Sequence, residues 1–371
     1  MRLKPAARRP KPCVTTLLAY RYAGRLCVCA SCCQANHKAS RAGHDHADSD
    51  ERTDHPQRAG WPLSPNQDTP KATAPNQVLI GIEFSPINQS DLILAQGIYA
   101  SHPLLPTVIG NEGVGRVLAV GVGVENVKVG DRVLAPLSSF TWRERMVVSA
   151  NGLFPLPADA DPRQLSMLAI NPPTAALLLS DFVNLKPGEW LVQNSANSGV
   201  GRWVIAFAKT RGLKTVNIVR RPELVAELEA IGGDVVVVDS PDVSKEIKAA
   251  VGQADLRLAL DGVSGSATGV LASTLSPQGT LVSYAAMSLA PMPISPLDVI
   301  FKRVTVRGFW LGHPVPAAKI APAVALAAEM IASGEVHMPV AAIYPLSSIM
   351  EAVAHAQRGG KVLLDVAGSS R

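Results

Sequence analysis

Short apolar runs separated by glycine and other turn residues fill the stretch from Gln77 to Pro157. The runs cover residues 78–84, 114–120, 132–134 and 144–148. Short runs with turn residues at both ends are typical of β-strands, and Lys128-Val-Gly-Asp131 has the composition of a tight turn that leads into a strand. The pattern predicts a compact β-rich domain over residues 76–165.

From Trp190 onward the pattern changes to a regular alternation of strands and helices. The expected strands are residues 190–194, 215–219, 235–239, 256–261, 280–284 and 304–309. The expected helices between them are residues 200–211, 222–231, 244–251 and 264–275, with Pro222 at a first helical position and Gly212 and Gly232 at helix ends. Such alternation predicts a doubly wound, six-stranded parallel sheet, a Rossmann domain, over residues 166–312.

The last part of the chain, residues 313–371, is expected to return to the β-rich domain. A long apolar-faced helix is predicted over residues 317–332, and a helix at 347–357 and a strand at 361–366 follow. The fold class is therefore α/β, with one β-rich domain and one doubly wound domain.

The first Rossmann strand runs directly into Ser195-Ala-Asn-Ser-Gly-Val-Gly201 and then into a helix. At the carboxyl end of a strand, such a loop presents backbone N–H groups and the positive end of a helix dipole to a pyrophosphate. The strict GxGxxG spacing is absent, so the dinucleotide site is predicted from the strand, the helix and the five further strands around the loop.

The second strand ends in Arg220-Arg221, where a site specific for NAD places an acidic residue. A guanidinium can hold a 2'-phosphate with two hydrogen bonds and gains little from a free hydroxyl. The pair predicts NADPH as the cofactor. The alternative is a solvated arginine pair at the end of a strand.

The formal net charge of the 371 residues, +5, comes from one end of the chain. Residues 1–60 hold eleven Lys or Arg and five Asp or Glu, which leaves the remainder close to neutral. A neutral body offers no binding surface for a phosphate backbone, so nucleic-acid binding is not expected. No apolar stretch approaches the roughly 20 residues that cross a bilayer, so no membrane segment is expected.

All five cysteines lie in the same N-terminal part, between Cys13 and Cys33. The body therefore has no thiol for a disulfide, a metal or a nucleophile, which fits a reducing compartment such as the cytoplasm. Cys29 and Cys32 form a CxxC, but the second ligand pair of a zinc knuckle is not evident.

Residues 1–75 are expected to be a mostly unstructured tail or extension. Residues 1–43 contain basic but no acidic side chains, a composition typical of a mitochondrial presequence. That composition leaves the mitochondrial matrix open as the alternative compartment.

Three further motifs, together with residues 193–201, make a family recognisable. Gly110-Asn-Glu-Gly-Val-Gly115 in a β-rich domain, followed by a Rossmann domain, resembles the medium-chain dehydrogenase/reductase superfamily over residues 77–366. Residues 193–201, Ile170-Asn-Pro-Pro-Thr174 and Gly308-Phe-Trp-Leu311 are similar to its mitochondrial-type trans-2-enoyl thioester reductase branch. The resemblance implies a GroES-like catalytic domain beside the Rossmann domain, and a homodimer.

Zinc-dependent members of this superfamily hold a catalytic zinc with a Cys, with a His before the Glu-Gly pair, and with a further Cys or Asp. Here Ser85-Pro-Ile-Asn-Gln-Ser-Asp91 lacks a Cys, and Asn111 occupies the His position. A neutral amide is a poor zinc ligand, so no metal is expected.

The resemblance also assigns site residues. Tyr99, in Gln96-Gly-Ile-Tyr-Ala100, matches the family's catalytic tyrosine, and a phenol is a suitable proton donor. The resemblance places the following residues in the NADPH site: Asn171, Asn197, Ser198, Gly199, Val200, Gly201, Arg220, Arg221, Tyr284, Ala285, Ala286, Met287, Phe309, Trp310, Leu311 and Lys361.

The expected function is NADPH-dependent reduction of a trans-2-enoyl thioester of CoA or acyl-carrier protein in fatty acid synthesis, with hydride added to C3 and a proton to C2. Two alternatives stay open. The same scaffold can serve an NADPH:quinone or general alkene oxidoreductase, or an NADPH-binding protein without turnover. The family's first β-hairpin should precede Val78, and residues 44–76 show no strand pattern.

Overall fold

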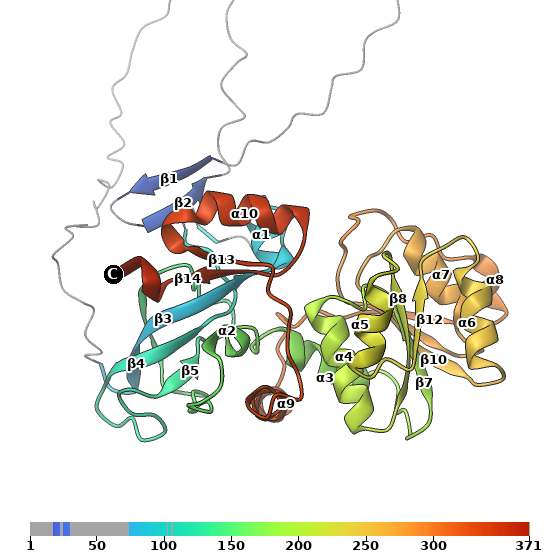
Figure 1. The fold of residues 1–371 in the computed structure, drawn as a ribbon, viewed down its shortest axis with the longest axis horizontal. Helices are drawn as coiled ribbons and strands as arrows, with labels where there is room; N and C mark the ends of the chain where they lie inside the picture. Colours follow the sequence, from blue (N-terminus) through green and yellow to red (C-terminus); the bar gives the residue numbers. More distant parts are fainter. Residues whose placement is uncertain (1–17, 23–24, 30–73, 102, 105–106, 371) are drawn as a thin grey trace, which may run out of the picture.

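The computed structural model describes residues 18–22, 25–29, 74–101, 103–104 and 107–370. Figure 1 shows two separate bodies joined through the helices between them, each built around a six-stranded sheet. The predicted α/β fold class is confirmed, because one sheet is mostly antiparallel and the other entirely parallel. Most of residues 1–43 and Cys32 of the CxxC lie outside the described residues. Among the described residues, no helix is long and apolar enough to cross a membrane.

The first body is built around the long strand β3, Gln77–Ile87. Its sheet runs in the order β13-β14-β3-β4-β5, and β6 also pairs with β3. Buried side chains such as Val78, Ile80 and Val117 form its core. The other strands are β4 (Val114–Val120), β5 (Arg132–Leu134), β6 (Arg145–Ser149), β13 (Ala342–Pro345) and β14 (Val362–Asp365).

The second body is a parallel sheet in the order β12-β11-β10-β7-β8-β9, a doubly wound arrangement. Its central strands are mostly buried and largely apolar because helices cover both faces of the sheet. The strands are β7 (Trp190–Gln193), β8 (Lys214–Val219), β9 (Val235–Val238), β10 (Leu256–Asp261), β11 (Thr280–Ser283) and β12 (Thr305–Gly308).

Helices connect the strands and join the two bodies. In Figure 1 α3 lies between the two sheets, and α9 packs against it. The helices are α1 (Gln89–Ala95), α2 (Pro162–Leu165), α3 (Asn171–Ser180), α4 (Gly199–Thr210), α5 (Leu224–Ala230), α6 (Val243–Val251), α7 (Ser266–Thr274), α8 (Pro296–Ile300), α9 (Ala317–Ala332) and α10 (Ile349–Arg358).

The predicted segments lie where the sequence places them. The pattern did not predict α1, α2, α8 or β13, and three further features differ. The pattern did not predict α3, because Pro172 and Pro173 suggest a loop; they sit in its first turn, where backbone N–H groups need no helical partner. Pro222 is not the first helical residue, since α5 begins at Leu224. Leu18–Tyr22 and Arg25–Cys29 form a two-stranded antiparallel pair within the segment expected to lack structure.

A carboxylate on β3 organises the charges of the first body. Glu83 accepts a hydrogen bond from Arg132 Nε at 2.8 Å and one from Arg116 Nε at 3.0 Å. Arg132 is 8% exposed and also donates to the carbonyl oxygens of Ala158 and Ala160, just before α2. Glu83 thereby compensates the buried guanidinium of Arg132, which holds the segment between the first sheet and α2.

Replacing Glu83 with Gln should lower the unfolding free energy by about 2 kcal/mol or more, because the buried Arg132 loses its counter-charge. Urea denaturation measures the change. Arg116→Ala is the matched control: its guanidinium, 47% exposed, pairs with the same carboxylate, so its loss should cost about 0–1 kcal/mol. Equal effects of the two substitutions would contradict this assignment.

Candidate functional site

The predicted phosphate loop forms a tight cradle before α4. Ser198 caps the helix by accepting a hydrogen bond from the backbone N–H of Gly201 at 3.1 Å. A side chain at Gly201 would lie 2.5–2.7 Å from the backbone of Ala196, and one at Gly199 would lie 2.9 Å from the amide group of Asn171. The loop therefore presents bare backbone and a helix N-terminus, an arrangement that fits a pyrophosphate.

Two buried polar side chains hold this loop from behind. Gln193 at the end of β7 donates to the carbonyl oxygen of Gly201 at 3.0 Å and to Asn217 at 2.8 Å. Arg202, in the first turn of α4, donates to the carbonyl oxygen of Asn197 at 3.2 Å and pairs with Glu227 on α5. The loop is thus fixed to both neighbouring elements before any ligand binds.

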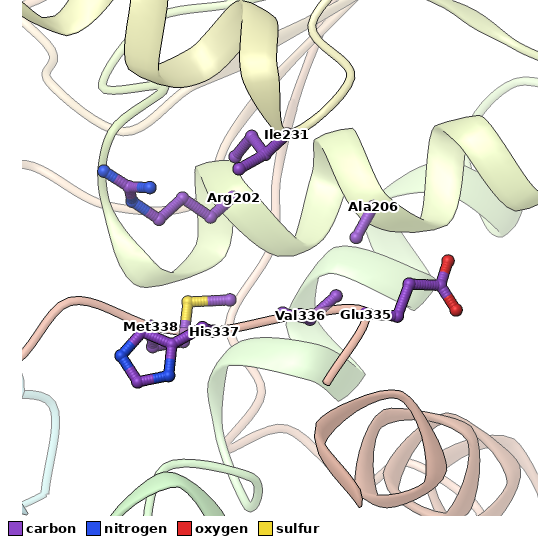
Figure 2. A pocket seen from close by; sticks show the side chains of 7 residues that line it. All are labelled: Arg202, Ala206, Ile231, Glu335, Val336, His337 and Met338. Atoms are coloured by element: carbon purple, nitrogen blue, oxygen red, sulfur yellow. The ribbon is translucent and has the colours of Figure 1, made fainter. Parts of the chain in front are cut away.

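Arg202 also lines a hollow on the other side of α4 (Figure 2). The hollow lies between α4, the end of α5 and the segment that follows α9. Its lining residues are Arg202, Ala206, Ile231, Glu335, Val336, His337 and Met338. None of them is a predicted site residue, so this hollow is separate from the predicted cofactor site.

Arg220 and Arg221 follow β8 directly and are exposed to solvent. Arg221 lies 3.6 Å from Glu223, and both side chains are more than 60% exposed. Arg220 makes no ion pair within the part of the chain that the structure describes. Both guanidiniums are therefore accessible to an anion at this strand end, although the structure does not place them against the phosphate loop.

The segment from Tyr284 to Met287 follows β11 and reaches the phosphate loop. Met287 Sδ lies 3.6 Å from the hydroxyl of Ser195, and the hydroxyl of Tyr284 is buried next to Gly262. Burial raises the pKa of that hydroxyl, and the neighbouring side chain of Ser198 opposes the rise. Ala285 and Ala286 are exposed at the same edge. The Tyr284–Met287 segment therefore lies at the same edge of the sheet as the phosphate loop.

Asp261, the last residue of β10, fixes the turn next to the Tyr284–Met287 segment. Its carboxylate accepts hydrogen bonds from the side chains of Asn194 and Thr268 and from the N–H groups of Val263 and Ser264. The turn that follows β10 is therefore rigid, and it supports the Tyr284 segment.

Tyr99 and Trp310 meet although 211 residues separate them in the chain. The indole Nε1 of Trp310 donates a hydrogen bond to the hydroxyl of Tyr99 at 2.7 Å, and the rings meet edge to face at 5.8 Å. Leu311 is buried, and Phe309 packs edge to face against Phe182. Because the hydroxyl of Tyr99 accepts this bond, its own proton remains free to donate elsewhere.

Lys361 belongs to a group of buried and half-buried polar side chains that we call the Glu112 network: the half-buried Asn88 and Lys361 and the buried Asp91 and Glu112. The ammonium of Lys361 donates to Asn88 Oδ1 at 2.6 Å, and Asn88 Nδ2 donates to Glu112 Oε1 at 2.9 Å. Burial lowers the pKa of Lys361, and the charges of Glu112 and Asp91 oppose that shift.

The second oxygen of Glu112 reaches the other body. It accepts from the backbone N–H groups of Ala169 and Ile170 at 3.1 and 3.0 Å, directly before α3. Burial raises the pKa of Glu112, and the ammonium of Lys361 opposes that rise. Asn171, the next residue, faces Gly199 of the phosphate loop. One carboxylate therefore connects Lys361 with the cofactor loop.

Asp91, the third charged member of the Glu112 network, accepts hydrogen bonds from the backbone N–H groups of Asn88 and Asn111 at 2.8 and 2.9 Å. Asn88, Asp91 and Glu112 are not among the site residues predicted from the sequence. The available signal was the position of two carboxylates within short, otherwise uncharged motifs, since carboxylates are rarely fully buried without partners.

The stability of the chain should depend on pH through Asp91. Burial raises the pKa of Asp91 from 3.8 to about 7, so folding takes up a proton between these values. The unfolding free energy should therefore fall as pH rises from about 4 to about 7 and level off above. Asp91→Asn cannot titrate and should show a shallower slope than the wild type in urea denaturation measured across that range, while the buried Glu112 keeps its own contribution.

The exposed Asp255 provides the control, because Asp255→Asn should keep the wild-type slope. Parallel wild-type and Asp91→Asn curves over this range would refute the role of Asp91.

Comparisons with known proteins identify the family of this chain. Residues 74–158 match the alcohol dehydrogenase GroES-like domain family, and residues 199–329 match the zinc-binding dehydrogenase family. The chain is 40% identical over 243 residues to the mitochondrial enoyl-[acyl-carrier-protein] reductase of Caenorhabditis elegans, covering 64% of this chain and 70% of that protein.

Solved structures agree with this placement. The complex of Etr1p with NADP and crotonyl-CoA superposes with a TM-score of 0.74 at 26% identity, covering 81% of this chain and 93% of the other. The Escherichia coli quinone oxidoreductase complexed with NADPH superposes with a TM-score of 0.72 at 25% identity, covering 81% and 94%.

The zinc in one family description does not fit the residues present here. No group of three or more His, Cys, Asp or Glu that could hold a metal occurs among the described residues. The amide of Asn111 donates to the hydroxyl of Ser90 at 3.1 Å, and its backbone N–H donates to Asp91. The absence of a catalytic zinc stays a prediction. The chain belongs to the medium-chain dehydrogenase/reductase superfamily, in its enoyl thioester reductase branch.

Proposed function

We propose that this enzyme reduces trans-2-enoyl thioesters of CoA or acyl-carrier protein with NADPH. The hydrogen bond between Trp310 and Tyr99 carries the proposal, because it brings a phenol of the first domain to a residue that directly follows the Rossmann sheet. The names of the relatives, enoyl-[acyl-carrier-protein] reductase and a complex with NADP and crotonyl-CoA, support the substrate class.

The residues present fit the cofactor. The bare loop from Asn197 to Gly201 would receive the pyrophosphate, and the exposed Arg220 and Arg221 would receive a 2'-phosphate. Tyr284, with Ala285, Ala286 and Met287, would line the nicotinamide end, because this segment lies beside the phosphate loop. Asn171, Lys361 and the Phe309–Leu311 segment complete the set that we assign to this site.

Tyr99 supplies the proton in this proposal. NADPH, when bound, supplies a hydride to C3 of the enoyl group. Tyr99 then donates its phenolic proton to C2, and the N–H of Trp310 stabilises the negative charge that develops on the phenol oxygen. The half-buried position of both rings limits the access of water to this proton.

Tyr99→Phe should reduce kcat for crotonyl-CoA reduction by about 100-fold or more, because a positioned proton donor contributes on this order. The oxidation of NADPH, followed at its nicotinamide absorbance, measures the rate. A quinone serves as the control substrate, and its reduction should change little because it needs no proton delivered to carbon.

Unchanged crotonyl-CoA reduction in Tyr99→Phe would reject the role of Tyr99. Wild-type enzyme that reduces quinones but not crotonyl-CoA would instead favour the quinone oxidoreductase alternative, which the superposition on the E. coli enzyme supports.

Substitution of Arg220 and Arg221 by Ala should raise KM for NADPH by about 10-fold or more and leave KM for NADH within about twofold. The physical reason is the loss of charge-assisted hydrogen bonds to a 2'-phosphate that NADH lacks. Initial rates with both cofactors measure the effect. An equal rise in KM for NADPH and for NADH would show that the two arginines do not bind the 2'-phosphate.

We also propose the domain boundaries of the sequence analysis: a tail over residues 1–75, catalytic parts over 76–165 and 313–371, and the Rossmann domain over 166–312. We propose a homodimer, supported by the exposed apolar side chains of Leu297, Ile300 and Phe301 at and beside α8. Relatives are known in an Etr1p/Etr2p heterodimer. The nematode relative is named mitochondrial, which favours the presequence interpretation of residues 1–43 over a cytoplasmic enzyme.

A further inference from the structure

The turn that follows β12 folds the Trp310 side chain back over its own backbone. The N–H of His313 donates to the carbonyl oxygen of Trp310 at 3.1 Å and closes the turn Trp310-Leu-Gly-His313. The imidazole of His313 meets the indole edge to face at 5.1 Å. The indole thus lies between His313 on one side and Tyr99 on the other.

Gly312 occupies the one place in this turn where a side chain would meet the indole. A Cβ at position 312 would lie 2.2 Å from Cζ2, 2.4 Å from Cε2 and 2.7 Å from Cη2 of Trp310. These separations are far below van der Waals contact, so a side chain there forces the indole ring or the turn that carries it to shift. The same ring carries the Nε1 that donates to Tyr99 at 2.7 Å.

We propose that Gly312 is a positioning residue for the proton donor: its missing side chain lets the Trp310 indole lie where it holds the Tyr99 hydroxyl. This inference rests on the proposed function. Hydride addition at C3 moves the π electrons toward the thioester oxygen. The O–H bond of Tyr99 then breaks as the C2–H bond forms, and water returns a proton to the phenolate. The N–H of Trp310 stabilises that phenolate only while the indole stays in place.

Gly312→Ala should lower kcat for crotonyl-CoA by about 10-fold and leave KM for NADPH within about twofold, since the variant removes one hydrogen bond to a developing anion. In a Tyr99→Phe background the same substitution should change kcat less than twofold, because its effect passes through that hydroxyl. Gly308→Ala is the matched control, since a Cβ at position 308 meets no atom within 4 Å.

Fluorine NMR of protein labelled with 5-fluorotryptophan tests the geometry without turnover. The chain has five tryptophans, and the resonance missing from Trp310→Phe identifies Trp310. That resonance should shift in Gly312→Ala and in Tyr99→Phe, and should not shift in Gly308→Ala. Trp310→Phe, which removes the N–H and adds no atom, should lower kcat as Gly312→Ala does, and the two losses should not add.

An unchanged Trp310 resonance and an unchanged kcat in Gly312→Ala would overturn the inference. So would a kcat loss of the same size in the Tyr99→Phe background. If the fluorine resonance shifts as expected but the wild-type enzyme does not reduce crotonyl-CoA, the positioning role of Gly312 is supported. The proposed function is then rejected.

Discussion

The burial of the Glu112 carboxylate is the constraint on which the two halves of the site depend. A carboxylate without water must be matched by donors, and Glu112 finds them in Asn88 and in the N–H groups of Ala169 and Ile170. These donors come from different bodies of the chain. The need to satisfy one buried charge therefore fixes the start of α3 against the first domain, next to Gly199 of the phosphate loop.

The same constraint extends to the cofactor residues on either side. Asn88 connects Glu112 with Lys361 through one hydrogen bond to each, and Asn171 of α3 lies against Gly199. Small displacements of α3 would move Asn171 and the phosphate loop together, because the loop has no free space around Gly199 and Gly201. The network thus holds α3 and the phosphate loop in one geometry before a ligand binds, which reduces the cost of binding.

The proton-donor half of the site has a different kind of support. Tyr99 and Trp310 are half-buried aromatic residues with one hydrogen bond between them, and Trp310 is held by its own turn rather than by buried charges. The cofactor side of the site therefore rests on a buried ionic network, and the donor side on ring packing and the room left by Gly312. A site with a rigid cofactor half and an aromatic donor half suits acyl substrates that must enter beside an already bound cofactor.

The hydrophobic pattern alone predicted the α/β fold, the strands of the parallel sheet, the strands of the first sheet except β13, and the position of the phosphate loop, because periodic burial follows from the local order of the residues. The motifs around Gly110 and Gly308 further determined the family. Only the tertiary structure decided which polar groups meet: the pairing of Tyr99 with Trp310, the burial of Asp91 and Glu112, and the contact of Gly312 with the indole. These depend on segments far apart in the chain, and a carboxylate or a glycine has no local pattern that reveals whether it will be enclosed.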